Sequence, residues 1–305
     1  MPTFNKASRL KITLESLKRL KLTDLVEIVI VNDGSVDDTW DLLELFKRQT
    51  QDNEYLSVNI VDSENTGRSA ARNKAIESAK GKLLIFIDDD LILAPDFVDK
   101  HIQMHEQHEK AVVHGRIYSL PYLKFFKDPT KGTLLEGGYS TGLLRDRLFD
   151  LSMFEDDRLN SYLARNARLS KYEKDIDCLF QNSSENDSHV RWVGLTGGNV
   201  SVMKEELIKV GGFDINLGKE WGCEDIELGY RLYKEGLRFY YCTEAVNYHI
   251  SHYRDGFLSI HNKAMDYFIE KHRDRYIYAL KEYFTGRLTS LLEWKQQIED
   301  SQLNI

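Results

Sequence analysis

The chain has 305 residues, of which 42% are hydrophobic, and its formal net charge is -8 at pH 7. This length and composition suit one large domain or two small ones, and the negative charge argues against general nucleic-acid binding. The cysteines lie far apart without a CxxC pairing, which favours reduced thiols over a disulfide framework or a zinc site. No apolar run reaches the ~18 residues of a membrane span and no signal peptide opens the sequence, so we expect a cytoplasmic protein.

The first 118 residues alternate between segments with helical spacing and short apolar runs. Apolar or small residues at helical spacing predict helices, over residues 6–20, 69–79 and 95–110. Continuous apolar runs predict buried strands, over residues 26–31, 56–61, 83–87 and 111–117. This alternation is typical of an α/β fold in which a mostly parallel sheet is flanked by helices.

The pattern changes after residue 118 and divides the chain into three parts, 1–118, 119–254 and 255–305. Residues 119–191 mix charges, glycines and aromatics without a period, so we expect an irregular insertion over the carboxyl edge of the sheet. Regular patterns return from residue 192, and the last part is predicted to be a helical tail. Its aromatic residues favour a packed amphipathic helix or a self-association surface over membrane docking.

Three aspartates follow the strand of residues 83–87, at the edge where a parallel sheet binds ligands. Because strand side chains alternate, Asp88 and Asp90 point to one side and Asp89 to the other. Two carboxylates so arranged can hold a hard divalent cation that bridges to substrate phosphates. A solvated acidic turn ahead of the helix that starts near Pro95 is the alternative.

Two further polar turns, at residues 32–35 and 64–68, follow the two preceding strands. In a parallel sheet such turns converge with the aspartates on one crevice. Asp33 can accept a hydrogen bond from the N–H edge of a base, while Arg68 or Arg72 can face a phosphate. Each turn alone is commonplace, and it is their convergence that favours a ligand site.

Glu224 and Asp225 open a predicted helix directly after Trp221 and Gly222. Acidic residues commonly lie at helix starts, because the helix dipole is positive there. Alternatively, a carboxylate fixed beside an aromatic platform is what a general base for a sugar hydroxyl requires. The Gly-Gly-Asn run at residues 197–199 has little side-chain bulk, which suits a wall where a ligand lies against backbone.

The nine histidines offer two candidate groups. His101, His105 and His108 have helical spacing, but they lie on a polar helix face without a set of carboxylates, so we do not favour metal binding there. His249, at the end of an apolar strand-like run, and His252 are better ligand candidates. A pair of carboxylates with one imidazole fits manganese, which accepts both oxygen and nitrogen ligands.

Several ordered motifs match one known family when they are taken together. In the first half they are Pro2–Asn5, Val31–Ser35, Asn65–Gly67 with Ala71–Asn73, and Ile87–Asp90. In the second half they are Gly197–Val200, Gly212–Asp214 and Trp221–Leu232. Over about residues 1–254, with a gap at the insertion, the chain resembles family-2 glycosyltransferases of the GT-A fold. Its second half is similar to the C-terminal galactosyltransferase-type segment of bacterial chondroitin polymerase modules and β-1,4-galactosyltransferases.

The resemblance implies a GT-A fold and a role for each matched position. Residues 1–118 would bind the nucleotide sugar, and residues 119–254 would supply the acceptor and catalytic half. The nucleotide would be bound by Thr3, Asn5, Asp33, Gly67, Arg72 and Asp88, with uridine at Thr3 and Asp33 and the ribose at Asp88. Mn2+ or Mg2+ on the diphosphate would be bound by the DXD-type pair Asp88 and Asp90 together with His249.

The resemblance also implies the residues at the reacting sugar. Asp225 would be the base that deprotonates the acceptor hydroxyl, and Glu224 would contact the acceptor. Because Asp225 lies at a helix start, we expect its pKa to be lowered. The donor and acceptor pocket would be completed by Gly197, Gly198, Asn199 and Trp221.

The implied reaction is metal-dependent, inverting transfer of a hexose or N-acetylhexosamine from a UDP-sugar to an acceptor hydroxyl. A glycan, a lipid-linked carrier, a peptide or a small molecule could be the acceptor, and polysaccharide biosynthesis is the implied setting. The alternatives are a retaining transferase of the same fold, a sugar nucleotidyltransferase and a non-catalytic assembly partner. The nucleotidyltransferase would need a glycine-rich phosphate loop, and the segment around Lys6 and Arg9 lacks the glycines. The tail offers a surface for a homo-oligomer.

One feature departs from the family pattern at the start of the sequence. Family members place a hydrophobic strand before the Pro-Thr-Phe-Asn turn, in the middle of the sheet, whereas here Met1 directly precedes Pro2. Without that strand its two neighbours would carry unpaired backbone groups, each costing about 1–3 kcal/mol when buried. We therefore expect either a natural start further upstream or another segment in that position.

Overall fold

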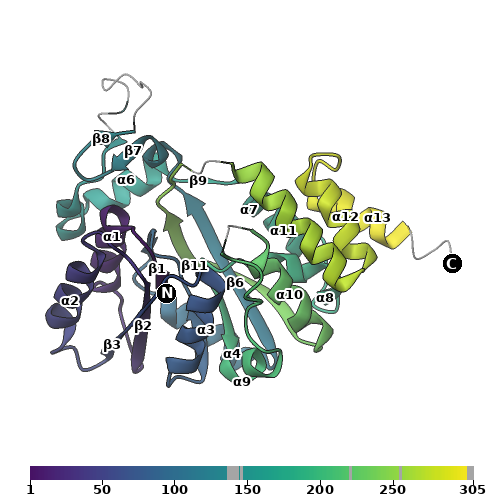
Figure 1. Ribbon diagram of the computed structural model, residues 1–305, viewed down its shortest axis with the longest axis horizontal. Helices are drawn as coiled ribbons and strands as arrows, with labels where there is room; N and C mark the ends of the chain where they lie inside the picture. The colour runs from purple at the N-terminus through teal and green to yellow at the C-terminus, as the bar shows by residue number, and fades with distance from the viewer. Residues whose placement is uncertain (136–143, 145–146, 220–221, 254–255, 301–305) are drawn as a thin grey trace.

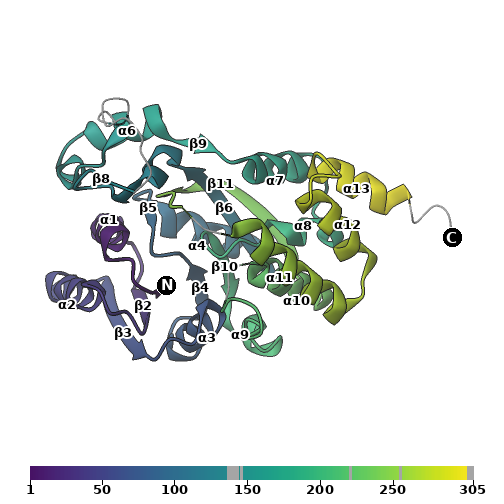
Figure 2. The same ribbon diagram turned by 45° about the horizontal axis from the view of Figure 1, so that its top comes forward.

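The computed structural model describes residues 1–135, 144, 147–219, 222–253 and 256–300. Its strands form two larger sheets and a small hairpin, and helices pack around the sheets (Figure 1). A second view shows the N-terminal sheet and its helices on one side of the molecule and the tail helices at the opposite end (Figure 2). The α/β class predicted from the sequence is confirmed.

The first sheet is parallel, as the alternation of its strands and helices predicts. It has the order β1-β2-β3, formed by β1 (Pro2–Thr3), β2 (Val26–Asp33) and β3 (Leu56–Ser63). Helices α1 (Ala7–Leu17), α2 (Thr39–Thr50) and α3 (Arg68–Ser78) each follow one of these strands in the chain. The last six residues of β2 are all buried, and the strand ends at Asp33. The sheet therefore delivers this carboxylate to its own carboxyl edge.

The second sheet is mixed rather than mostly parallel. Its main path is β4-β10-β6-β11-β5, formed by β4 (Leu83–Phe86), β10 (Val200–Met203), β6 (Ala111–Ser119), β11 (Arg238–His249) and β5 (Leu91–Leu93). Strand β10 runs antiparallel to both β4 and β6, while β11 runs parallel to β6 and antiparallel to β5. The mixture arises because β10 inserts between two strands that precede it by at least 80 residues. Helix α4 (Phe97–Gln107) packs on this sheet.

The insertion of residues 119–191 contains more regular structure than its sequence pattern predicts. Its elements are the short helices η1 (Pro121–Phe125) and η3 (Leu151–Glu155), strands β7 (Phe126–Asp128), β8 (Thr133–Leu134) and β9 (Arg168–Leu169), and helices α6 (Arg158–Asn166), α7 (Lys171–Gln181) and α8 (Ser188–Arg191). The Ser170 hydroxyl caps α7 by accepting from the Glu173 N–H. This serine with an acid three residues later is a helix-start signal that the sequence prediction missed.

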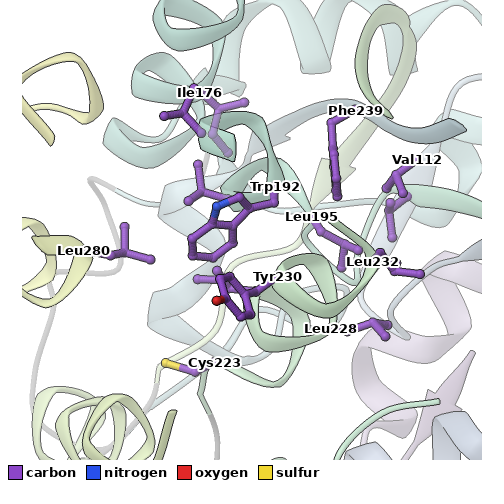
Figure 3. Close-up of a cluster of buried hydrophobic side chains, with 14 of the residues drawn as sticks. Val112, Ile176, Trp192, Leu195, Cys223, Leu228, Tyr230, Leu232, Phe239 and Leu280 are labelled. Atoms are coloured by element: carbon purple, nitrogen blue, oxygen red, sulfur yellow. The ribbon is translucent and has the colours of Figure 1, made fainter. Parts of the chain in front are cut away.

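The tail forms helices α11 (Phe257–His272), α12 (Arg275–Phe284) and α13 (Leu291–Asp300). The predicted helical tail is thus confirmed over these bounds. Trp294 of α13 packs edge-on against Trp192 of the short helix η4 (Trp192–Gly194), with ring centroids 5.9 Å apart. This core also contains Tyr230 and Leu280 (Figure 3). Self-association through the tail stays a prediction.

Helix α10 (Glu224–Lys234) follows α9 (Lys204–Lys209) and is held against the tail by ionic contacts. Glu227 of α10 is fully buried and accepts hydrogen bonds from Lys271 and His272 of α11. The tail therefore fixes the helix whose first residues are Glu224 and Asp225. Among the described helices, none combines the length and the apolar character needed to cross a bilayer.

An apolar groove of about 270 Å3 separates β2 from β4, and Ile28, Ile85 and Phe97 are among its lining residues. The described parts of the two sheets share no hydrogen-bonded ladder across it. The Met1 amino group lies beside the groove and donates to the Val29 carbonyl at 2.9 Å. Burial lowers the pKa of this amino group to about 5. The further strand or substitute segment that we expect from the sequence stays a prediction.

Candidate active site

A polar cleft of about 260 Å3 opens at the carboxyl ends of the N-terminal strands. It is lined by Pro2, Thr3, Phe4, Lys6, Asp33, Asn65, Gly67, Arg68, Asp88, Asp89, Asp90, Gly218, Lys219 and His252. Three of the turns singled out in the sequence therefore meet here, as their position after neighbouring strands predicts. Residues 218–219 and His252 close the cleft from the second half of the chain.

Asp33 links the end of β2 to the start of α3. One of its carboxylate oxygens accepts from the Thr66 N–H and hydroxyl, and the other accepts from the Gly67 N–H. Asp33 is buried and holds the turn that carries Gly67 into the cleft. Asn5 instead fixes the neighbouring loop, since its side-chain oxygen accepts from the Val36 N–H at 2.8 Å. Among the six predicted nucleotide residues, Asn5 and Arg72 are the two that do not line the cleft.

Asp90 forms a compact group with two imidazoles from the end of β11 and the residues after it. The Nε2 atoms of His249 and His252 lie 3.5 Å and 3.3 Å from its carboxylate oxygens. The three candidate ligand atoms all lie within 4.8 Å of one another. The sequence indicated both histidines, but the expected metal set contained Asp88 in place of His252. Lys6 also lies beside this group, with Nζ 3.3 Å from Asp90.

Asp88 is directed to a different partner. Its Oδ1 accepts from Nη2 of Arg72 at 2.9 Å, so it does not belong to the group around Asp90. The structure groups Asp90 with the two histidines instead, and the expected metal set, in which Asp88 and Asp90 act together, stays a prediction. Between them, Asp89 is buried, and burial together with the nearby charge of Asp90 raises the pKa of its carboxyl to about 6.

Arg72 is buried among three carboxylates and does not face the cleft. Its side chain is 1% exposed, and Nη1 donates to Asp225 at 2.6 Å and to Glu224 at 3.3 Å. The predicted contact of Arg72 with a nucleotide stays a prediction, and here the guanidinium is enclosed by these carboxylates instead. Arg68 lines the cleft instead, and it also donates to Glu224 at 3.0 Å.

Asp225 lies at the first turn of α10 with a partner on each oxygen. Oδ1 accepts from Arg72, and Oδ2 accepts from the Gly197 N–H at 2.9 Å. Burial raises the pKa of this carboxyl to about 6, despite the opposing charge of Arg72. The expected lowering of its pKa by the helix start is thus wrong, since burial outweighs the helix dipole here.

Glu224 is more deeply buried than Asp225, with its side chain 2% exposed compared with 24%. Burial opposes its ionisation, but the charges of Arg68 and Arg72 outweigh burial and lower its pKa. Its predicted contact with an acceptor stays a prediction, and here Arg68 and Arg72 both donate to its carboxylate. Asp225 is therefore the carboxylate of this pair that a ligand can reach.

The Gly-Gly-Asn run divides between the site and the core. A Cβ atom on Gly197 would lie 2.2 Å from Arg72 Nη2, so only glycine lets the guanidinium reach Asp225 and Asp88 here. Gly198 faces the Asp88 carboxylate. The Asn199 side chain is fully buried and bonds to His101 and to two backbone carbonyls, and its predicted place in the pocket stays a prediction. The predicted pocket residue Trp221 lies outside the described residues.

The histidines of α4 have a structural role. His101 and His105 both bond to the Ser201 hydroxyl, and His101 bonds to Asn199 as well. Burial lowers the pKa of His101 to about 3 and that of His105 to about 4, so both imidazoles are neutral near pH 7. The sequence preference for His249 and His252 over this group agrees with these contacts.

Two family models match the chain. Residues 1–162 match glycosyl transferase family 2, and residues 179–255 match the N-terminal domain of galactosyltransferase. The first match covers more than half of the chain and includes all three turns of the cleft. The second covers His249 and His252 and both acidic residues at the start of α10.

The chain is similar to several curated proteins over most of its length. It is 31% identical to the uncharacterized glycosyltransferase YfnE of Bacillus subtilis, over 83% of this chain and 64% of that protein. It is 29% identical to validoxylamine A glucosyltransferase of Streptomyces hygroscopicus, over 89% of this chain and 60% of that protein. With Escherichia coli chondroitin synthase the identity is 26%, over 82% of this chain and 34% of that protein. The chain thus spans less than two thirds of each of these relatives.

Solved structures share the fold at low sequence identity. The mannosyltransferase PcManGT of Pyrobaculum calidifontis, in complex with GDP-Man and Mn2+, has a TM-score of 0.56 at 16% identity over 93% of this chain and 68% of that chain. GalNAc-T7 with UDP, GalNAc and Mn2+ has a TM-score of 0.55 at 18% identity over 94% of this chain and 50% of that chain. The predicted GT-A fold is thereby confirmed.

Proposed function

Because the chain belongs to glycosyl transferase family 2, we propose that this glycosyltransferase moves a hexose or N-acetylhexosamine from a UDP-sugar to an acceptor hydroxyl with inversion. One observation carries the proposal: a single guanidinium, that of Arg72, bonds both to Asp225 and to the cleft residue Asp88, at 2.6 Å and 2.9 Å. The candidate base therefore lies next to the candidate donor site, within the span that one transferred sugar requires.

The cleft offers the groups that a nucleoside diphosphate needs. Thr3, Asp33 and Gly67 form the part of the wall assigned to the nucleoside. The side chains of Arg68 and Lys219 bring positive charge to the same cleft and are suited to the diphosphate. GDP-Man and UDP both occur in structures with this fold. The choice of UDP rests on the family resemblance, and a screen of nucleotide-sugar donors tests it.

The residues around Asp90 fit a divalent cation of the manganese type. One carboxylate oxygen and two imidazole nitrogens, from Asp90, His249 and His252, form a mixed donor set. Mn2+ accepts such a set, whereas Mg2+ prefers oxygen ligands in a near-ideal octahedron. We therefore favour Mn2+ over Mg2+. When bound, the cation would supply charge neutralisation for the departing diphosphate.

Asp225 would act as the general base. As the acceptor oxygen attacks the anomeric carbon, its proton passes to Asp225, and the bond from that carbon to the diphosphate oxygen breaks on the opposite face. The pKa of about 6 suits this role, because the carboxylate is ionised at neutral pH and yet more basic than an ordinary aspartate. Retention of configuration would need a different path, and the anomer of the product distinguishes the two mechanisms.

A donor screen tests the proposal. The purified protein is incubated with Mn2+ and each of the common UDP-sugars, with GDP-mannose as the purine control, and nucleotide release is followed with and without a chelator. We expect hydrolysis of at least one UDP-sugar and its loss when the metal is removed. Binding of UDP without turnover of any donor would instead favour a non-catalytic role, and turnover of GDP-mannose alone would overturn the uridine assignment.

Gly197→Ala should lower transfer by on the order of 10²-fold, because displacing a catalytic group by about 1 Å has effects of that size. The added Cβ would lie 2.2 Å from Arg72 and 2.7 Å from Asp225 Oδ1, so at least one of them must move. Gly81→Ala is the matched control, since the nearest atom to its Cβ would be 3.5 Å away. The rates of both variants are measured at a saturating concentration of the donor found in the screen. Equal rates for the two variants would contradict the packing argument.

A further inference from the structure

We propose that Arg72 is a positioning residue that holds Asp225 in its reactive orientation and fastens it to Asp88 on the donor side. The proposal rests on the proposed function, because it takes Asp225 as the base. It assigns to Arg72 a task other than the nucleotide contact that the sequence suggested. It also explains why a helix of small residues carries a guanidinium into the interior of the protein.

Arg72 donates its hydrogen bonds to carboxylates that come from distant parts of the chain. Asp88 lies two residues after the end of β4, while Glu224 and Asp225 open α10 in the second half of the chain. The guanidinium also lies over the ring of Phe213, 5.1 Å from its centroid. Its Nε is buried and has no hydrogen-bond partner among the described residues. The two Nη atoms therefore make all of its contacts with carboxylates.

The contacts of Asp225 leave it one orientation. Arg72 bonds to Oδ1 and the Gly197 N–H bonds to Oδ2, so rotation of the carboxyl group would break two hydrogen bonds. Each oxygen keeps a second lone pair that can receive a proton. The side chain is 24% exposed, which leaves it within reach of an acceptor hydroxyl. Arg72 thus fixes the orientation of the Asp225 carboxylate and leaves it able to accept a proton.

The local charges make Asp225 dependent on Arg72. Glu224 and Asp88 both lie close enough to favour protonation of Asp225, whereas Arg72 favours its ionised form. Arg68 bonds to Glu224 and not to Asp225, so it cannot take over both contacts. Without Arg72 the carboxylates would face each other with only part of their charge compensated. Asp225 would then bind a proton more readily and would lose its fixed direction.

A buried arginine can also be purely structural, and the chain contains such a case for comparison. Arg191 is buried as well, but it donates to the backbone carbonyls of Phe180, Ser183 and Phe239 and to a serine hydroxyl. Its guanidinium lies over the Phe180 ring at 4.8 Å. Arg191 therefore matches Arg72 in burial and ring contact but contacts no carboxylate at the site. It is the control for stability effects.

The first experiment compares Arg72→Met and Arg72→Lys with Arg191→Met. Transfer rate, the Michaelis constant for the donor, UDP affinity by calorimetry and the melting temperature are measured for each. We expect Arg72→Met to lower kcat by on the order of 10²-fold, with UDP affinity changed by less than about threefold. Arg72→Lys should recover part of kcat, because lysine restores the positive charge but not the planar set of N–H donors that a guanidinium presents. Arg191→Met should lower the melting temperature and leave kcat near that of the parent.

The second experiment tests whether Arg72 acts through Asp225. If it does, Arg72→Met lowers transfer in the parent but causes no further loss in the Asp225→Asn background, under single-turnover conditions. The acid limb of the kcat profile should also move to higher pH in Arg72→Met, because the cation that favours the ionised carboxylate is gone. Arg72→Lys serves for the same measurements if the methionine variant does not fold.

The outcomes separate this inference from the proposed function. Undiminished transfer by Asp225→Asn would overturn the base assignment itself, whatever Arg72 does. An inactive Asp225→Asn combined with an unchanged kcat in Arg72→Met would overturn the positioning role alone. Loss of UDP affinity that matches the loss of kcat would show that Arg72 binds the nucleotide, and it too would refute the inference.

Discussion

Asp225→Asn is expected to lower sugar transfer by about 10²–10⁴-fold, the usual contribution of a general base, while nucleotide affinity stays within about twofold of the parent. The amide keeps the shape of the side chain and can still accept from Arg72 or from the Gly197 N–H. It cannot take the proton of the acceptor hydroxyl. Transfer is followed at saturating donor, and UDP binding is measured by calorimetry in the presence of Mn2+.

The matched control for this variant is Asp177→Asn. Asp177 on α7 pairs with Arg116 at 3.0 Å, and its side chain is 21% exposed, close to the 24% of Asp225. It lies outside the cleft, so its replacement should leave transfer near the parent rate. Comparable rates for the two variants would mean that the proton leaves by another route. A parallel loss of UDP affinity in Asp225→Asn would mean instead that the residue supports the donor site.

The pH dependence gives the same prediction a second readout. Burial raises the pKa of Asp225 to about 6, and the base acts only in its ionised form. Transfer by the parent should therefore fall as the pH decreases through about 6 and stay level just above it. The measurement needs saturating Mn2+, because imidazole ligands also bind protons in competition with the metal. The residual transfer of Asp225→Asn should lack that acid limb.

Features that lie at the ends of strands were predictable from the sequence. Asp33 and Asp88–Asp90 follow apolar runs, and the rule that ligands bind at carboxyl edges places them in one cleft. His249 ends β11 and meets Asp90 because β11 pairs antiparallel with β5, with His249 opposite Leu91. His252 follows three residues later in the chain. Such predictions succeed because one local pattern and one rule of topology are sufficient.

The contacts of Arg72 could not be predicted in that way. Its partner Asp225 lies 153 positions away, and no local spacing records which cation will face which carboxylate. The same limit explains the pKa of Asp225, since the helix start is visible in the sequence whereas the burial that outweighs it is not. Asn199 was assigned to the pocket because it follows two glycines, but the direction of its side chain depends on a contact with His101 of α4.

The mixed second sheet shows a related limit. Strand β10 was predicted as part of an ordered segment, and its place between β4 and β6 depends on how the chain returns after the insertion. Antiparallel pairing there keeps Val200 beside Phe86 and Gly197–Gly198 near Asp88. The position of the glycines next to the aspartates is thus a product of topology. Sequence alone indicated only that the two segments belong to the same family pattern.

Asp90→Ala is expected to weaken Mn2+ binding by more than about 100-fold. Losing a residue that only hydrogen-bonds to a metal ligand already lowers metal affinity by about 10–100-fold, and Asp90 would itself be a ligand. Asp90 is the only carboxylate among the three described residues of the group. Without it, the imidazoles of His249 and His252 would remain beside the Lys6 side chain, which lies 3.3 Å from Asp90, and the group would offer the cation no carboxylate. Binding is measured by the electron paramagnetic resonance of free Mn2+, with and without UDP.

Asp88→Asn distinguishes the metal set of the structure from the one expected from the sequence. Asp88 is two residues from Asp90 and bonds to Arg72, so neutralising it should change Mn2+ affinity by less than about threefold even if transfer falls. His252→Ala, in contrast, removes a ligand and should weaken Mn2+ binding by at least about tenfold. Equal losses of Mn2+ affinity in Asp88→Asn and Asp90→Ala would support the metal set expected from the sequence, in which both aspartates are ligands. An unchanged Mn2+ affinity in Asp90→Ala would refute that set and the set of the structure alike. The structure separates these outcomes because each aspartate has its own partner, an arginine for one and two imidazoles for the other.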